Sequence, residues 1–155
     1  MCKIMTLSLR RAKSDDLSAI LAMARAFHAE DGHALDAPGE AAIAVLIATP
    51  ELGRLWLIED NGDTIGYVAL CFGFSIEYGG RDAFIDDLYI VPDARGRGLG
   101  GTAMQLVAQD ARASGCLALH LEVMDENSGA TRLYERHGFA NRGSRLMSRR
   151  MEALT

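Results

Sequence analysis

A glycine-rich segment lies between a run of β-forming residues and a run with helical spacing. It covers residues 92–105, PDARGRGLGGTAMQ, and holds four glycines within six positions, beside Arg95 and Arg97. Glycine lets backbone N–H groups approach an anion closely, and the helix dipole favours negative charge at a helix start. The segment therefore predicts a strand, a loop and a helix that together hold a phosphate-bearing ligand.

Three other interpretations of this loop were weighed. Gly96, Gly98 and Gly101 spell G-x-G-x-x-G, and Glu122 lies 21 positions after Gly101, where a dinucleotide-binding fold has its ribose-binding acid. That fold, however, places the fingerprint in its first βαβ unit, whereas three antiparallel-looking strands precede the loop here. A P-loop is disfavoured because Thr102 follows Gly101 without a lysine. A plain tight turn without a ligand is also disfavoured, because it needs fewer glycines than this loop has.

Composition limits the class of protein. With 155 residues, 49% of them hydrophobic and 24% charged, the chain is expected to form one domain over residues 1–155. It has no apolar run of the roughly 18 residues that a membrane span needs. The N-terminus lacks the pattern of a signal peptide, so we expect a cytoplasmic protein without a membrane partner. The net charge of -5 disfavours nucleic acid and suits a cationic partner.

The cysteines and histidines do not indicate a metal site. Cys2, Cys71 and Cys116 are far apart and form no C-x-x-C pair, which argues against a disulfide framework or bound zinc. We expect Cys71 and Cys116 in the core and Cys2 as a terminal thiol. The four histidines lack ligand spacing, and no Ser/His/Asp or Cys/His set is evident. The sequence therefore predicts no metal and no covalent enzyme intermediate.

Hydrophobic periodicity predicts an alternating α/β order. Strands are expected over residues 6–11, 55–59, 64–74, 83–91 and 117–123. Helices are expected to start at Ser14, to cover residues 40–49, to follow the glycine loop as far as Gly115, and to end at Gly138. Asn61-Gly62 predicts a tight hairpin. The tail over residues 139–151 is expected to add two short strands.

Two motifs resemble one family. Residues 85–92, IDDLYIVP, and the RGRGLG that starts at Arg95 resemble the central motif of the GNAT superfamily of acetyl-CoA-dependent N-acetyltransferases. Residues 127–139, NSGATRLYERHGF, are similar to the family's Asn-x-x-Ala-x-x-x-Tyr helix with its following Gly-Phe. The resemblance covers nearly the whole chain. It implies an α/β single-domain GNAT fold, with a mixed, mostly antiparallel sheet of six or seven strands, parallel splayed strands four and five, and about four helices.

The resemblance also implies acetyl-CoA as cosubstrate. Pantetheine would bond to the backbone of the splayed strand at Leu88, Tyr89 and Ile90. The pyrophosphate would be held by Arg95, Gly96, Arg97, Gly98, Leu99, Gly100 and Gly101. Asn127 would bond pantetheine, although an Asn before a helix is equally typical of an N-cap.

Acetyl transfer to an amine needs the nucleophile neutral, yet an alkyl ammonium has a pKa near 10.4. By the resemblance, Asp86 or Asp87 would accept the proton, through water, and Asp87 would hold a cationic substrate. Adjacent strand residues point to opposite faces, so both aim inward only if a β-bulge intervenes. Tyr134 would protonate the leaving thiolate. The alternative to this role is that Tyr134 is only a tyrosine packed in the core.

Acidic residues around the expected acceptor pocket favour a small cationic amine such as a polyamine, aminoglycoside or amino-acid derivative. They are Glu30 and Asp31 in one loop and Glu77 before the fourth strand, together with Asp87. A solvated acidic face would give the same pattern. Alternatives in function are acetylation of a protein lysine or N-terminus, and a non-catalytic acyl-CoA sensor. A homodimer is implied by the resemblance alone.

Overall fold

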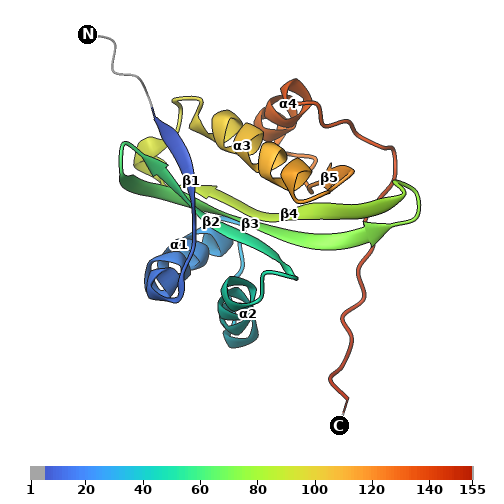
Figure 1. The fold of residues 1–155 in the computed structure, drawn as a ribbon, viewed down its shortest axis with the longest axis horizontal. Coiled ribbons are helices and arrows are strands. Elements are labelled where there is room, and N and C mark those ends of the chain that lie inside the picture. Colours follow the sequence, from blue (N-terminus) through green and yellow to red (C-terminus); the bar gives the residue numbers. More distant parts are fainter. Residues whose placement is uncertain (1–5, 155) are drawn as a thin grey trace.

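The computed structural model describes residues 6–154, which form one sheet with helices on both of its faces. Figure 1 shows α1 and α2 on one face and α3 and α4 on the other. The strands are β1 (Leu7–Arg11), β2 (Gly53–Asp60), β3 (Asp63–Ser75), β4 (Gly80–Ile90) and β5 (Ala118–His120). The helices are α1 (Leu17–Glu30), α2 (Ala37–Ala48), α3 (Leu99–Ala113) and α4 (Ser128–Arg136). Cys2 lies outside the described residues.

The sheet has the order β1-β2-β3-β4-β5, with three antiparallel pairs followed by the parallel pair β4 and β5. Asn61 and Gly62 connect β2 to β3 with φ angles of 52° and 91°. Positive φ at both positions gives the turn a twist that matches a hairpin, and this confirms the predicted Asn-Gly turn. The mixed α/β fold predicted from the sequence is also confirmed.

Two apolar layers fix the helices to the sheet. Alternation along β2 sends Trp56 and Ile58 to one face and Leu57 to the other. Trp56 and Ile58 pack against α3 on the first face. Leu57 packs on the second face with Ile20 and Ala24 of α1, both of which are completely buried. Burying an aliphatic side chain of this size contributes about 1.5–3 kcal/mol. Helical periodicity in the sequence thus identified the buried faces correctly.

The C-terminal part of the chain differs from expectation. Residues 139–154 contain no strand, and the sheet over residues 6–154 has five strands where six or seven were expected. β5 covers three residues, although a strand over 117–123 was predicted. A strand is defined by bonds to a neighbouring strand, and the tail has no such neighbour among residues 6–154. Figure 1 shows it running past the β3–β4 turn and away from the sheet.

Two further features concern membrane spans and free thiols. No helix within residues 6–154 is long and apolar enough to cross a membrane. Cys71 and Cys116 are free and partly buried, and Cys116 packs against the apolar core, where it was expected. Desolvation raises the pKa of both thiols, which keeps them protonated near neutral pH.

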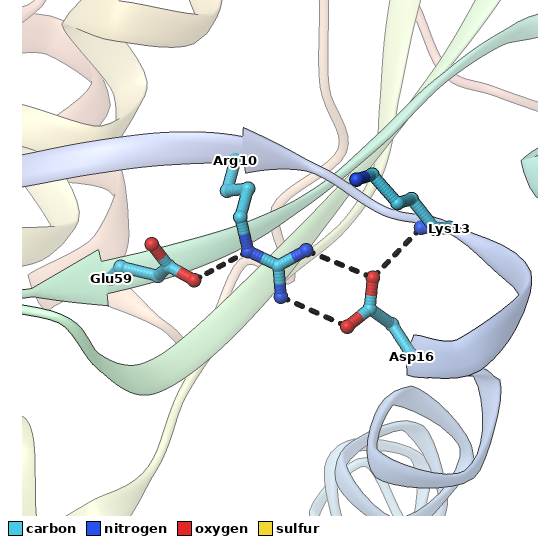
Figure 2. A network of polar contacts seen from close by, with 4 residues as sticks. All are labelled: Arg10, Lys13, Asp16 and Glu59. Atoms are coloured by element: carbon cyan, nitrogen blue, oxygen red, sulfur yellow. Dashed lines mark hydrogen bonds and ion pairs between the residues drawn. The ribbon is translucent and has the colours of Figure 1, made fainter.

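A polar network joins the start of α1 to the edge of the sheet (Figure 2). Arg10 on β1 donates to both carboxylate oxygens of Asp16, at 3.0 and 2.9 Å, and to Glu59 on β2, at 2.6 Å. Asp16 also accepts from the backbone N–H of Lys13, at 2.8 Å, and so closes the turn before the helix. Hydrogen bonds from Arg10 and Lys13 lower the pKa of Asp16 to about 2. The network fixes the angle at which α1 leaves β1.

Asp16→Asn should lower the free energy of unfolding at pH 7 by about 0.5–1 kcal/mol, because it breaks a network that is partly open to water. The lowered pKa means that the carboxylate stabilises the fold above its unfolded pKa and ceases to do so as the pH falls toward 2. Urea unfolding at several pH values measures this. The exposed Asp15→Asn variant is the control, and an equal loss in both variants would contradict the network's role.

Candidate active site

The parallel strands β4 and β5 separate soon after they meet. Their pairing covers only Asp82–Phe84 and residues 118–120, although β4 continues to Ile90. Beyond Phe84 the edge of β4 therefore has no strand partner among the described residues. The predicted splay at Leu88 to Ile90 is confirmed, and an open edge of this kind can bond an extended ligand as it would another strand.

A β-bulge falls at the mouth of this opening. Ala69 pairs with Asp87 and the next residue of β3, Leu70, pairs with Ile85, which leaves Asp86 as the extra residue. A bulge resets the alternation of side chains along a strand. Asp86 consequently lines the cleft between β4 and β5, while Asp87 points to the α1 face. The bulge brings both carboxylates to one end of β4 but in different surroundings.

The glycine loop connects β4 to α3. Gly98 is the N-cap of α3 with a φ of 74°, and no side chain caps the helix start. The first amides of α3 are thus available to a ligand. A cavity of about 390 Å³ opens against them. It is lined by Leu88, Ile90, Ala94, Arg95, Gly96, Gly98, Leu99, Gly100, Gly101, Ala130, Leu133 and Tyr134.

The two arginines of the loop have carboxylate partners within the chain. Arg95 donates to the carbonyl of Ile90, at 2.8 Å, and to both oxygens of Glu30, at 2.9 and 3.0 Å. Arg97 donates to Asp60 at 2.9 Å. Two-point binding of a carboxylate uses the same guanidinium geometry that binds a phosphate. Arg95 and Glu30, predicted for the cofactor and the substrate respectively, therefore contact each other in this structure.

A second cavity, of about 140 Å³, adjoins the first. Tyr134 of α4 lines both cavities, and Asp86 lines the second together with Asp31 and Glu122. Burial raises the pKa of Tyr134, so its hydroxyl remains a proton donor at neutral pH. Desolvation by the walls of the cleft, followed by the charge of Asp87, raises the pKa of Asp86. The cleft thus brings a proton donor and a carboxylate of increased basicity to one junction.

Asp87 belongs to a buried polar group that the sequence did not reveal. Its Oδ2 accepts a hydrogen bond from the hydroxyl of Tyr67, at 2.8 Å, and lies 3.6 Å from Nε2 of His28. Tyr67 is completely buried on β3, and His28 lies in the last turn of α1. These residues are distant in sequence. The sequence interpretation gave His28 no role, because the four histidines lack ligand spacing.

Other predicted site residues occupy varied positions. Asn127 caps α4 through a bond from the backbone N–H of Ala130, at 3.1 Å, and it also lines the second cavity. Tyr89 is buried, its carbonyl faces Gly66 of β3, and it lines neither cavity, so the structure does not bring it to the cleft. Glu77 lies in the β3–β4 turn and pairs with Arg142. From the start of β4 at Gly80, the strand runs six residues, or about 20 Å, before it reaches Asp86. The structure does not bring Glu77 to the cleft.

The arrangement suits an elongated ligand with phosphates at one end. The first cavity offers amides at a helix start, and an added Cβ at Gly101 would lie 2.6 Å from Nε2 of His137, so a side chain there would require the imidazole to move. The open edge of β4 then leads to the second cavity. Within residues 6–154 no cluster of three or more histidine, cysteine or acidic side chains could hold a metal ion.

The fold and the cleft place the chain in the class of acetyl-CoA-dependent N-acetyltransferases, which are acyltransferase enzymes. The model of the acetyltransferase (GNAT) family matches residues 16–139, and the chain belongs to this family. The family resemblance of its motifs is thereby confirmed.

Individual relatives agree with this assignment. The chain is 29% identical to the uncharacterized N-acetyltransferase YhfO of Bacillus subtilis (strain 168), over 86% of this chain and 89% of the relative. It is 36% identical to the thialysine N-epsilon-acetyltransferase of Bos taurus, over 48% of this chain and 43% of the relative. A solved integron cassette protein, HFX_CASS3, from the mobile metagenome of Cole Harbour Salt Marsh, is 35% identical with a TM-score of 0.81, covering 94% and 91% of the two chains.

Gly98→Ala should weaken coenzyme A binding by about tenfold, because a side chain at positive φ costs roughly 1–2 kcal/mol and tilts the helix start away from the ligand. Isothermal titration calorimetry measures the affinity. Gly79→Ala is a matched control, since Gly79 has a φ of 80° in the β3–β4 turn and open space around it. Equal affinity for the wild type and Gly98→Ala would contradict a role for this loop.

Proposed function

We propose that the protein transfers an acetyl group from acetyl-CoA directly to the primary amine of a small cationic molecule, with both substrates bound at once. The observation that carries this proposal is the pair of adjoining cavities that share Tyr134. One cavity has the glycine loop for phosphates and the other has carboxylates for an amine. Transfer then takes place where the two meet.

The first cavity supports acetyl-CoA as the donor. The amides of the loop and the start of α3 would bind the pyrophosphate, and Arg95 and Arg97 would exchange their carboxylate partners for phosphates. Pantetheine would bond to the backbone of residues 88–90 along the open edge of β4. This course leads the thioester from the loop toward Tyr134.

Two groups at the junction would perform the proton transfers. Asp86 would accept, through water, the proton that the ammonium loses before attack, and its raised pKa favours this role. Tyr134 would donate a proton to the departing thiolate, since burial keeps its hydroxyl protonated. No metal and no covalent enzyme intermediate takes part in this scheme.

The second cavity supports a cationic acceptor. Asp31, Asp86 and Glu122 border it, and its volume of about 140 Å³ suits the amine-bearing end of a cationic molecule. Glu30 would join this acidic set once Arg95 turned to a phosphate. Polyamines, aminoglycosides and amino-acid derivatives with a free side-chain amine are the candidate acceptors.

A thiol-release assay with acetyl-CoA tests the proposal against a panel of polyamines, aminoglycosides, amino acids, and a lysine peptide. Release is expected with a small cationic amine and not with the peptide.

In parallel, Tyr134→Phe should lower kcat by about 10²-fold and change coenzyme A affinity little, because the ring still packs against Phe139. Coenzyme A binding without release from any amine would instead support a sensor, and full activity of Tyr134→Phe would exclude the proton-donor role.

A homodimer is a further part of this proposal. The tail carries exposed apolar side chains, among them Leu146, Met147 and Met151, and the outer edge of β5 has no strand partner within residues 6–154. A second copy would offer a matching edge and tail, so the contact is self-complementary. Sedimentation velocity should show a dimer that dissociates on deletion of residues 144–154. A monomeric full-length chain at micromolar concentration would contradict it.

A further inference from the structure

His28 shares one carboxylate oxygen with a buried tyrosine. Its Nε2 lies 3.6 Å from Oδ2 of Asp87, and the same oxygen accepts the hydroxyl of Tyr67 at 2.8 Å. The side chains of His28 and Asp87 are 22% and 12% exposed. Because Tyr67 is fixed in the core, it holds Asp87 in place, and Asp87 in turn faces the imidazole. The three side chains form a connected group from β3 through β4 to α1.

The groups that face His28 come from every element around it. Asp86 and Asp87 face it from β4, and the charge of a protonated His28 lowers the pKa of Asp86. The ring of His33, in the loop after α1, lies 5.0 Å away, and that of Phe27 lies 5.4 Å away. His28 also lies in the last turn of α1, where the helix dipole favours a cation. Two carboxylates and a helix end therefore surround the imidazole of His28.

The chemistry of the proposed reaction needs such a group. An alkyl ammonium gives up its proton more readily to an imidazole than to a carboxylate, whose conjugate acid is stronger by about two to three pKa units. We propose that His28 is a positioning residue of the acetyl transfer, which takes up, through the adjacent Asp86 and Asp87 and bound water, the proton that the acceptor ammonium loses before attack. This inference rests on the proposed function.

The protons balance as follows. The ammonium loses one proton, which passes by way of Asp86 to His28 and then to solvent. The amine nitrogen attacks the acetyl carbonyl, the new C–N bond forms, and the C–S bond breaks. Tyr134 gives its hydroxyl proton to the departing thiolate. The nitrogen then loses a second proton, which returns through water to Tyr134. Nothing is oxidised or reduced, and one proton is released in each turnover.

His28→Gln tests this assignment, because glutamine keeps a polar amide near Asp87 but cannot take up a proton. At pH 7 kcat/KM should fall by about 10²-fold relative to wild type. The deficit should shrink to about twofold near pH 10, where much of the acceptor is already a free amine. A purely structural loss would give the same ratio of rates at every pH. His28→Ala with added imidazole should recover part of the activity, and the recovery should follow the concentration of neutral imidazole.

The matched control is His33→Gln. His33 is the neighbouring ring, and no contact between it and a carboxylate is found within residues 6–154, so this variant should keep the wild-type pH profile. The inference is overturned if wild type transfers acetyl while His28→Gln retains its rate or loses it equally at all pH values. It is also overturned if imidazole fails to rescue a folded His28→Ala. Absence of thiol release by the wild type with every amine would overturn the proposed function itself, so the two failures are distinct.

Discussion

The separation of β4 from β5 is the constraint on which the site depends. The two strands pair over only three residues of each, after which the backbone of β4 is open while β5 has ended. Unsatisfied backbone groups inside a protein are costly, so an open edge persists only where water or a ligand can reach it. The apolar layer under β4, with Leu70 and Ile85 buried, keeps the strand in place despite the missing partner.

Charge in the cleft is balanced by contacts that bridge the two faces of the sheet. Arg95 of the loop binds Glu30 at the end of α1, and Asp87 of β4 is met by His28 of the same helix. The C-terminal end of α1 thus contacts both the phosphate side and the acceptor side. Exposed pairs such as Arg95 with Glu30 contribute little to stability, about 0–1 kcal/mol, and can open when a phosphate competes.

Local sequence signals predicted much of the fold. Asn61-Gly62 fixed a hairpin because both positions require positive φ, and the glycine loop marked the strand-to-helix junction because Gly98 must adopt a left-handed conformation. Helical periodicity identified the face of α3 that is buried. In each case the information lies within a few residues of the structure it specifies.

Long-range contacts could not be predicted in this way. The bulge at Asp86 depends on how β3 and β4 come into register, and the pairing of Arg95 with Glu30 joins positions 65 residues apart. Tyr67 gave no signal because a tyrosine in a buried strand resembles any other core residue. The two short strands expected over residues 139–151 are absent, because a segment forms a strand only where it bonds to a partner edge, and the tail meets none within residues 6–154.

The central claim is that the opened edge of β4 and the glycine loop hold acetyl-CoA. Amide hydrogen exchange of the wild type with and without coenzyme A tests this most directly, because each backbone N–H that bonds to the ligand becomes protected. The account predicts added protection concentrated in residues 88–90 and 96–101. Protection confined to other segments, or none in these two at saturating ligand, would contradict it.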